Sequence, residues 1–332
     1  MASRPTIAAA ARSERLRRLA KQKSLLALEP KVLGQLDDFL AEFGIGQVPN
    51  GQDWVDFVVE GCRSEGREDL ATRFFELHEQ QRSLIEAGDA VPDKLNEDYY
   101  DLLAEDPVFG LAHSRKRPII LDEAALLTAL SNALEMGGTA LDIGCNGGYL
   151  ALWLSSQGCF REVIGIDLSE RAIAYAVKKR ADLGIQHATF QIGRAPGALP
   201  AGPFDLVYAF DAIPLEKHLF EALSPRIVDG GLLVVTGPEA ANQDAAIGVA
   251  ASRNGFGFEF ADVVGGWDGS GFSTRGVMVF VRGSRELVSK HWEARSQNDW
   301  PAFRDYANSG VVPEEKTQAF QRTRSRFGGN QT

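Results

Sequence analysis

The chain has 332 residues, of which 44% are hydrophobic and 24% charged, and its formal net charge is −10. This composition is typical of a globular protein with a full core, and the negative charge disfavours nucleic acid as a partner. Because no apolar run approaches the roughly 18 residues that span a bilayer, we do not expect a membrane protein. Three scattered cysteines predict neither a disulfide framework nor a metal site, and they favour a reducing, cytoplasmic compartment.

Charge divides the chain into unequal segments. Residues 1–28 carry seven basic and one acidic side chain, whereas residues 29–106 carry six basic and twenty acidic ones. Such asymmetry predicts separate structural units. We expect a helical N-terminal domain over residues 1–118, an α/β domain over 119–283 and a helical C-terminal extension over 284–332. Residues 1–28 predict a basic helix that docks on the acidic segment, with a transit peptide as the alternative.

Apolar residues at three- and four-residue spacing predict four helices between residues 29 and 110. These helices cover Val32 to Phe43, Trp54 to Val59, Leu70 to Ile85 and Asp93 to Leu103. Glycines at 44 and 88 end the first and third of them. We expect this segment to cap a substrate pocket or to form the interface of a homodimer.

After Pro118, a helix over Asp122–Leu134 is followed by alternating strands and helices. The predicted strands are Thr139–Ile143, Glu162–Asp167, Ala188–Ile192, Phe204–Phe210, Gly231–Thr236, Phe258–Val264 and Gly276–Val281. The helices between them are Tyr149–Ser156, Glu170–Leu183, Leu215–Leu223 and Ala240–Asn254. This alternation predicts an α/β fold with a mostly parallel, seven-stranded Rossmann-like sheet. Its last two strands are able to form an antiparallel hairpin at the edge.

The most informative motif is the sequence Leu-Asp-Ile-Gly-Cys-Asn-Gly-Gly-Tyr at residues 141–149, between a buried strand and a helix. Glycines there let the backbone turn tightly and approach a ligand, and the helix offers free N–H groups. The carboxylate of Asp142 would repel a pyrophosphate but would pair with an ammonium or a sulfonium. The dinucleotide pattern G-x-G-x-x-G and the P-loop pattern are both absent.

This segment resembles the first motif of the class I S-adenosylmethionine-dependent methyltransferases, which reads acid-x-Gly-x-Gly-x-Gly. The matching positions are Asp142, Gly144, Asn146 and Gly148, with asparagine in place of the commonest glycine. The resemblance covers about residues 137–283. It implies S-adenosylmethionine as cofactor, S-adenosylhomocysteine as product, and a cradle for the amino-acid part of the cofactor. The expected cradle residues are Asp142, Gly144, Cys145, Asn146, Gly148 and Tyr149.

Two further segments extend the expected cofactor site. Asp167 ends the second strand, where the family places the acid that accepts the ribose hydroxyls. The alternative is that Asp167 only caps the next helix, a role open to Ser169 as well. After the third strand the family often has an acid near the adenine amino group, and this chain has Arg194. We expect Leu168 and the backbone of Ala195 to hold the adenine, with Arg194 either stacked on the ring or solvated.

The end of the fourth strand faces the transferred methyl group in this family. The resemblance therefore makes Phe210 a cofactor contact and Asp211 the candidate acid or base. A helix cap is the alternative for Asp211, and a surface position for the second candidate base, His218.

Aromatic residues supply the candidate substrate contacts. Trp267 and Phe272 flank a glycine-rich segment that predicts either a substrate lid or a plain hairpin loop. Upstream, Tyr99, Tyr100 and His113 are candidates because family members often cover the cofactor with an N-terminal helical segment. An aromatic ring near the sulfonium would gain cation–π attraction.

The sequence thus predicts a methyltransferase that moves a methyl group by in-line displacement to an oxygen, nitrogen or carbon nucleophile of a small metabolite. A peptide or protein acceptor is the second hypothesis, and a tRNA acceptor is disfavoured by charge. A non-catalytic assembly or regulatory subunit on the same fold is another alternative. An aminopropyl transferase or an NAD enzyme would also use a related sheet, and the missing G-x-G-x-x-G pattern disfavours NAD.

Overall fold

The computed structural model describes residues 30–49, 51–133, 136–212, 217–237, 250–267 and 272–283. The predicted basic N-terminal helix, the C-terminal extension and most of the predicted helix Ala240–Asn254 lie outside these ranges. Among the helices described, none has both the length and the apolar character that crossing a bilayer requires.

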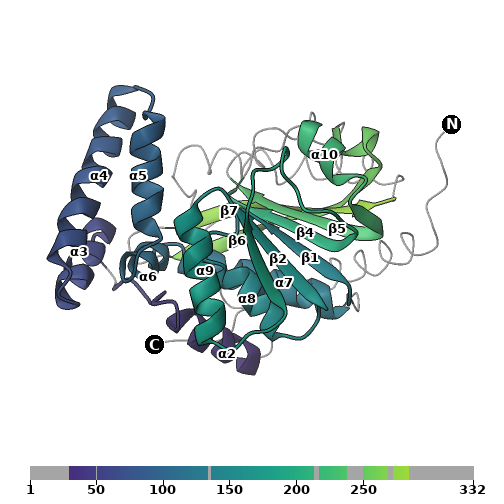
Figure 1. The fold of residues 1–332 in the computed structure, drawn as a ribbon, viewed down its shortest axis with the longest axis horizontal. Coiled ribbons are helices and arrows are strands. Elements are labelled where there is room, and N and C mark those ends of the chain that lie inside the picture. Colours follow the sequence, from purple (N-terminus) through teal and green to yellow (C-terminus); the bar gives the residue numbers. More distant parts are fainter. Residues whose placement is uncertain are drawn as a thin grey trace, which may run out of the picture.

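A seven-stranded sheet organises the α/β domain, and its strand order is β3-β2-β1-β4-β5-β7-β6 (Figure 1). The strands are β1 Thr139–Ile143, β2 Glu162–Asp167, β3 Ala188–Ile192, β4 Phe204–Phe210, β5 Ile227–Gly237, β6 Phe256–Trp267 and β7 Phe272–Arg282. The first five strands pair in parallel, whereas β7 runs antiparallel to both β5 and β6. The predicted fold class and the antiparallel hairpin at the edge are therefore confirmed.

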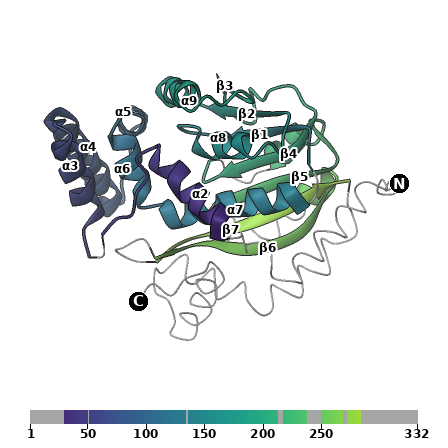
Figure 2. The same ribbon diagram turned by 90° about the horizontal axis from the view of Figure 1, so that it is seen from below.

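Side chains alternate between the two faces of the sheet, as the period of two requires. In β1, for example, Ala140 belongs to one hydrophobic cluster and Leu141 to the other. The first face packs against four helices, and the second face against α10. The four helices are α2 Pro30–Ala41, α7 Arg117–Ala133, α8 Tyr149–Ser156 and α9 Glu170–Asp182, and α10 spans Lys217–Leu223. Figure 2 shows α2 and α7 lying together beside β7.

Helices α3 Trp54–Ser64, α4 Glu68–Ala87 and α5 Asp93–Leu103 form a helical arm to one side of the sheet (Figure 1). The side chain of Asp53 caps α3, and Gly88 ends α4 in the left-handed conformation with a φ of 78°. The arm has its own hydrophobic cluster, separate from those of the sheet. Of the four predicted helices, α2 instead joins the first hydrophobic cluster of the sheet, where it packs on α7 and α8.

A short helix, α6 Val108–Ser114, joins the arm to the sheet and was not predicted. Val108 and Ala112 lie in the cluster of the arm, whereas Phe109 lies in a cluster of the sheet. The next helix, α7, begins at Arg117, five residues earlier than predicted. Pro118 therefore stands in the first turn of α7, where its missing N–H leaves no hydrogen bond unmade.

Candidate functional site

The loop after β1 (residues 144–148, the β1 loop) is held by its neighbours at the carboxyl edge of the sheet. The N–H groups of Gly144 and Cys145 both donate to the carbonyl oxygen of Ile166, at 2.8 and 3.0 Å. A Cβ on Gly144, whose φ is +74°, would lie 2.3 Å from the Cβ of Ala212. Glycine at this position thus lets the loops after β1 and β4 pack directly on each other.

Asn146 links the β1 loop to the end of β2. Its φ is 48°, a left-handed conformation that asparagine tolerates better than most residues, so the replacement of the family's glycine is accommodated. The N–H of Asn146 donates to Oδ2 of Asp167 at 2.9 Å, and the N–H of Ser169 donates to Oδ1 at 3.0 Å. The hydroxyl of Ser169 accepts from the N–H of Ala172, so Ser169 is the N-cap of α9. A carboxylate offers about four lone-pair sites, so Asp167 retains acceptor capacity for a ligand.

Removing the Asp167 carboxylate should weaken the fold as well as the site. We expect Asp167→Ala to lower the free energy of unfolding of the ligand-free protein by about 1–3 kcal/mol, because two N–H groups lose their acceptor. Urea denaturation measures this change. An unaltered midpoint would show that water replaces the carboxylate at both N–H groups.

Asp142 is a buried carboxylate with an unmet hydrogen bond. The residue is 3% exposed, and its Oδ2 has no hydrogen-bond partner within the described residues. Burial raises the pKa of Asp142 well above its ordinary value, and the charge of Asp167 raises it further. Tyr208 is the partner of Asp142 in the strand register, and its nearby hydroxyl lowers the pKa of Asp142 by part of this rise. Within the described residues, however, the geometry gives the Tyr208 hydroxyl no hydrogen-bond partner. Buried polar atoms without a hydrogen-bond partner are rare in native proteins, so Asp142, next to the end of β1, marks a candidate ligand site.

Further acidic groups surround Tyr149, the first residue of α8. Burial raises the pKa of the Tyr149 hydroxyl well above its ordinary value. The negative charges of Glu123, Asp142 and Asp211 raise the same pKa by smaller amounts. Glu123 comes from α7, is buried, and accepts a hydrogen bond from the Thr236 hydroxyl at 2.7 Å. The sheet edge beside the β1 loop is therefore negative and suits a cationic ligand.

Asp211 follows β4 in a strained conformation. Its φ is 50°, and its N–H donates to the carbonyl oxygen of Thr236 at 3.0 Å. The Nζ atom of Lys116 lies 3.4 Å from Oδ2 of Asp211. The preceding Phe210 is half-buried, with its ring centroid 5.5 Å from that of Tyr208. Such strain at a strand end is frequent at functional sites, where the surrounding structure enforces it.

The remaining residues that were predicted to contact the cofactor or to form a substrate lid differ in their exposure. Leu168 and Arg194 are exposed and Ala195 is half-buried, all near the ends of β2 and β3. Trp267 and Phe272 pair with each other across the β6–β7 hairpin, and their side chains lie outside the described part of the structure. Cys145 is buried, and burial raises the pKa of its thiol well above the ordinary value.

The predicted base and the upstream aromatic residues separate in the structure. His218 lies exposed on α10 with its Nδ1 3.2 Å from Oε2 of Glu221. Tyr99 is buried in the arm, stacked on Phe74, and Tyr100 is 55% exposed. Of the three upstream candidates, only His113 reaches the β1 loop, through a hydrogen-bond distance of 2.9 Å between its Nε2 and Nδ2 of Asn146.

Several residues beside the β1 loop and the end of β4 were not predicted from the sequence as site residues, and they come from helices as well as strands. They are Phe109, Lys116, Glu123, Tyr208 and Thr236. One signal was available for Glu123, which forms with Asp122 an acidic pair within an otherwise apolar helical run. Within the described ranges, no three His, Cys, Asp or Glu side chains are grouped to hold a metal ion.

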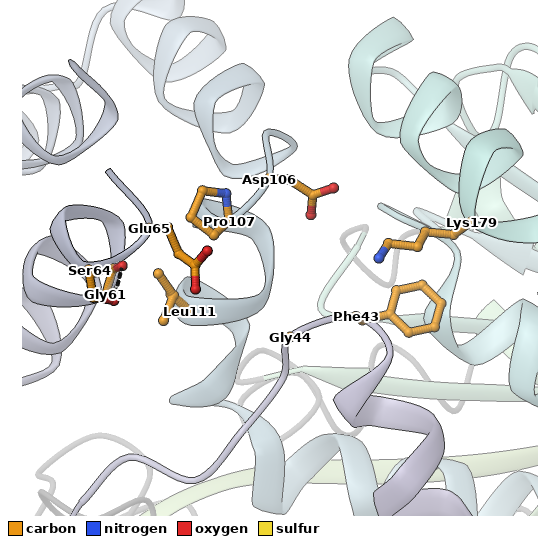
Figure 3. A pocket seen from close by; sticks show the side chains of 9 residues that line it. All are labelled: Phe43, Gly44, Gly61, Ser64, Glu65, Asp106, Pro107, Leu111 and Lys179. Carbon is orange, nitrogen blue, oxygen red and sulfur yellow. Dashed lines mark hydrogen bonds between the residues drawn. The ribbon is translucent and has the colours of Figure 1, made fainter. Parts of the chain in front are cut away.

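A cavity of about 380 Å³ lies away from this edge, between the arm, α6 and α9 (Figure 3). Its lining includes Phe43, Glu65, Asp106, Leu111 and Lys179. None of its lining residues belongs to a strand end or to the β1 loop. The cavity is thus separate from the negative edge of the sheet.

Comparison with known families agrees with the geometry of the β1 loop. Residues 140–228, from β1 into β5, match the family model described as a methyltransferase domain. These residues are therefore similar to a methyltransferase domain, in agreement with the prediction from the motif at residues 141–149.

The curated relatives share this domain rather than the whole chain. Ribosomal protein L11 methyltransferase from Burkholderia ambifaria (strain MC40-6) is 31% identical over 122 residues, which cover 37% of this chain and 39% of the relative. The protein of the same name from Thiobacillus denitrificans is 36% identical over 104 residues, covering 31% of this chain and 33% of the relative. The chain thus spans less than half the length of these relatives.

Solved structures also resemble the chain. Magnesium protoporphyrin IX methyltransferase from Synechocystis PCC 6803 with bound SAM has a TM-score of 0.41 and 20% identity, covering 71% of this chain and all of that one. Precorrin-6y C5,15-methyltransferase from Geobacter metallireducens has a TM-score of 0.41 and 14% identity, covering 50% of this chain and 92% of that one.

Proposed function

We propose that the protein is an S-adenosylmethionine-dependent methyltransferase that acts on a small-molecule acceptor. The observation that carries the proposal is the orphaned, buried carboxylate of Asp142 beside a glycine loop at the carboxyl edge of the sheet. The ammonium of the cofactor is the complementary partner for that carboxylate. Asp167, with acceptor capacity left after its two backbone hydrogen bonds, suits the ribose hydroxyls.

The residues of this chain have mainly to orient the cofactor and the acceptor and to exclude water from between them. S-adenosylmethionine supplies an activated methyl group, which passes to the acceptor while S-adenosylhomocysteine leaves and the acceptor gives up a proton where it carries one. Asp142 and the β1 loop would hold the amino-acid end, and Asp167 the ribose. Phe210 and Asp211 stand at the strand end that faces the acceptor in our proposal. A base is needed only for a protonated acceptor atom.

Asp211 is the proposed base, and one substitution tests it. We expect Asp211→Asn to leave the Kd for S-adenosylhomocysteine within twofold of the wild type and to lower turnover about 100-fold. Asparagine also tolerates the positive φ at this position, so the backbone should keep its shape. The surface substitution Asp229→Asn is the matched control. Equal turnover in Asp211→Asn would leave Asp211 with a structural role alone.

Calorimetry with S-adenosylmethionine, S-adenosylhomocysteine and NAD tests the cofactor part of the proposal. Binding of the first two, and not of NAD, is expected. Binding of NAD, or of none of the three, would contradict the proposal.

Transfer of a labelled methyl group then identifies the class of acceptor. A cell extract is divided by ultrafiltration into metabolites and macromolecules, and each fraction is incubated with the protein and methyl-labelled cofactor. We expect label in the metabolite fraction. A protein acceptor is favoured instead by the acidic helical arm and by the relatives' name, ribosomal protein L11 methyltransferase, and it predicts label on macromolecules. Cofactor binding without transfer in either fraction would favour the non-catalytic alternative.

A further inference from the structure

His113 is buried on α6 at the point where the arm meets the β1 loop. It is 8% exposed, and its ring stacks on Phe109 with 4.3 Å between centroids. Its Nδ1 lies 2.7 Å from the carbonyl oxygen of Phe109, and its Nε2 lies 2.9 Å from Nδ2 of Asn146. Both ring nitrogens are therefore engaged within the protein, which leaves neither to exchange a proton with a substrate.

The two partners fix which ring nitrogen carries the proton. A carbonyl oxygen only accepts, so Nδ1 must donate to Phe109. Burial, with a smaller contribution from the charge of Lys116, lowers the pKa of His113 to about 4, so the ring is neutral at physiological pH. The free lone pair of Nε2 consequently accepts from the side-chain amide of Asn146.

Asn146 transmits this contact to the proposed ribose site. Its side chain donates to His113, while its backbone N–H donates to Asp167 at 2.9 Å. The residue holds a φ of 48°, a left-handed conformation that asparagine tolerates better than most residues. One hydrogen-bonded chain thus runs from α6 through the β1 loop to the end of β2.

We propose that His113 is a positioning residue for cofactor binding, which fixes Asn146 so that the β1 loop and Asp167 keep their ligand-ready arrangement. This inference rests on the proposed function, because the cofactor is the ligand whose affinity it governs. His113 does not touch the cofactor in this scheme. It acts through the hydrogen bond from the side-chain amide of Asn146, which a glycine at position 146 could not make.

Two amide substitutions distinguish the roles of the hydrogen bonds at the two ring nitrogens of His113. In His113→Gln the side-chain oxygen reaches the position of Nε2, whereas in His113→Asn the shorter amide keeps only the bond to the Phe109 carbonyl. The probe is S-adenosylhomocysteine, titrated calorimetrically at pH 7.5. We expect His113→Asn to weaken binding about tenfold and His113→Gln to stay within about threefold of the wild type.

A double-mutant cycle then tests the route through Asn146. Asn146→Gly removes the side-chain amide and suits the positive φ. In that background, His113→Asn should change the Kd for S-adenosylhomocysteine less than twofold. An equal loss in both backgrounds would overturn the inference, because His113 would then act only through the packing of α6. Wild-type affinity in His113→Asn would overturn it as well.

The wild-type protein gives a readout that does not depend on the folding of any variant. Nitrogen-15 NMR of the His113 ring should report a protonated Nδ1 and an unprotonated Nε2, unchanged between pH 6 and pH 8. A proton on Nε2 would overturn the inference. If the wild type fails to bind S-adenosylhomocysteine, the proposed function and this inference fall together. If it binds and His113→Asn binds equally well, only the inference falls.

Discussion

Gly147→Ala is expected to weaken the binding of S-adenosylhomocysteine more than 100-fold and to lower the free energy of unfolding by about 1–3 kcal/mol. A Cβ at this position would lie 2.4 Å from Cε2 of Phe109 and 2.9 Å from Cδ1 of Tyr175. The Phe109 ring has no room to retreat, because it is stacked between His113 and Tyr175, with centroids 4.3 and 4.4 Å away. The β1 loop must therefore move, and the proposed cradle moves with it.

Gly137→Ala is the matched control for this substitution. Gly137 is exposed, just before β1, and an added Cβ would have nothing within 4 Å. We expect wild-type affinity and stability for that variant. Calorimetry and urea denaturation measure both quantities. Wild-type affinity in Gly147→Ala would mean that the β1 loop does not hold the cofactor.

Asp142→Asn should have opposite effects on binding and on stability. The amide lacks the charge that pairs with the ammonium of the cofactor, so we expect the affinity for S-adenosylhomocysteine to fall about 10- to 100-fold. The ligand-free protein should lose no stability, because the substitution removes a buried carboxylate with an orphaned oxygen. If Asp142 were needed only for the fold, Asp142→Asn would instead lower the stability of the ligand-free protein.

The pH dependence of folding gives a second test of Asp142. The folded protein raises the pKa of this group above 3.8, so it binds the proton more tightly than the unfolded chain does. The contribution of Asp142 to stability is therefore greatest at low pH and is lost as the pH rises through the raised pKa. Asp142→Asn should remove this loss, whereas the exposed control Asp89→Asn should leave the pH profile unchanged. A wild-type profile in Asp142→Asn would contradict the raised pKa.

The first four strands could be predicted residue for residue because their information is local. β1, β2 and β4 are short, mostly apolar runs bounded by turns, β3 is a short edge strand between turns, and all four have the bounds that the sequence predicts. Helices α5 and α8 also agree at both ends. The start of α7 was wrong because Pro118 was interpreted as a boundary, although proline is favoured in the first turn of a helix.

The parts of the site that escaped prediction depend on contacts between distant residues. The β1 loop and Asp167 are local motifs, and the structure brings them together. The contact between His113 and Asn146 joins residues 33 positions apart, through a helix too short to show a periodic pattern. Tyr99 and Tyr100 were indistinguishable in the sequence, but neighbours on a helix point about 100° apart, so one is buried and the other exposed.

The position of α6 in two hydrophobic clusters limits how the arm can be exchanged between proteins. Val108 and Ala112 pack in the hydrophobic cluster of the arm, whereas Phe109 packs in a hydrophobic cluster of the sheet. A chimera that replaces the arm up to residue 107 would keep the Phe109 and His113 contacts but would have to supply a new apolar partner for Val108. A junction placed after α6 would transplant the arm with all of its own cluster, but the β1 loop would lose its contacts with Phe109 and His113.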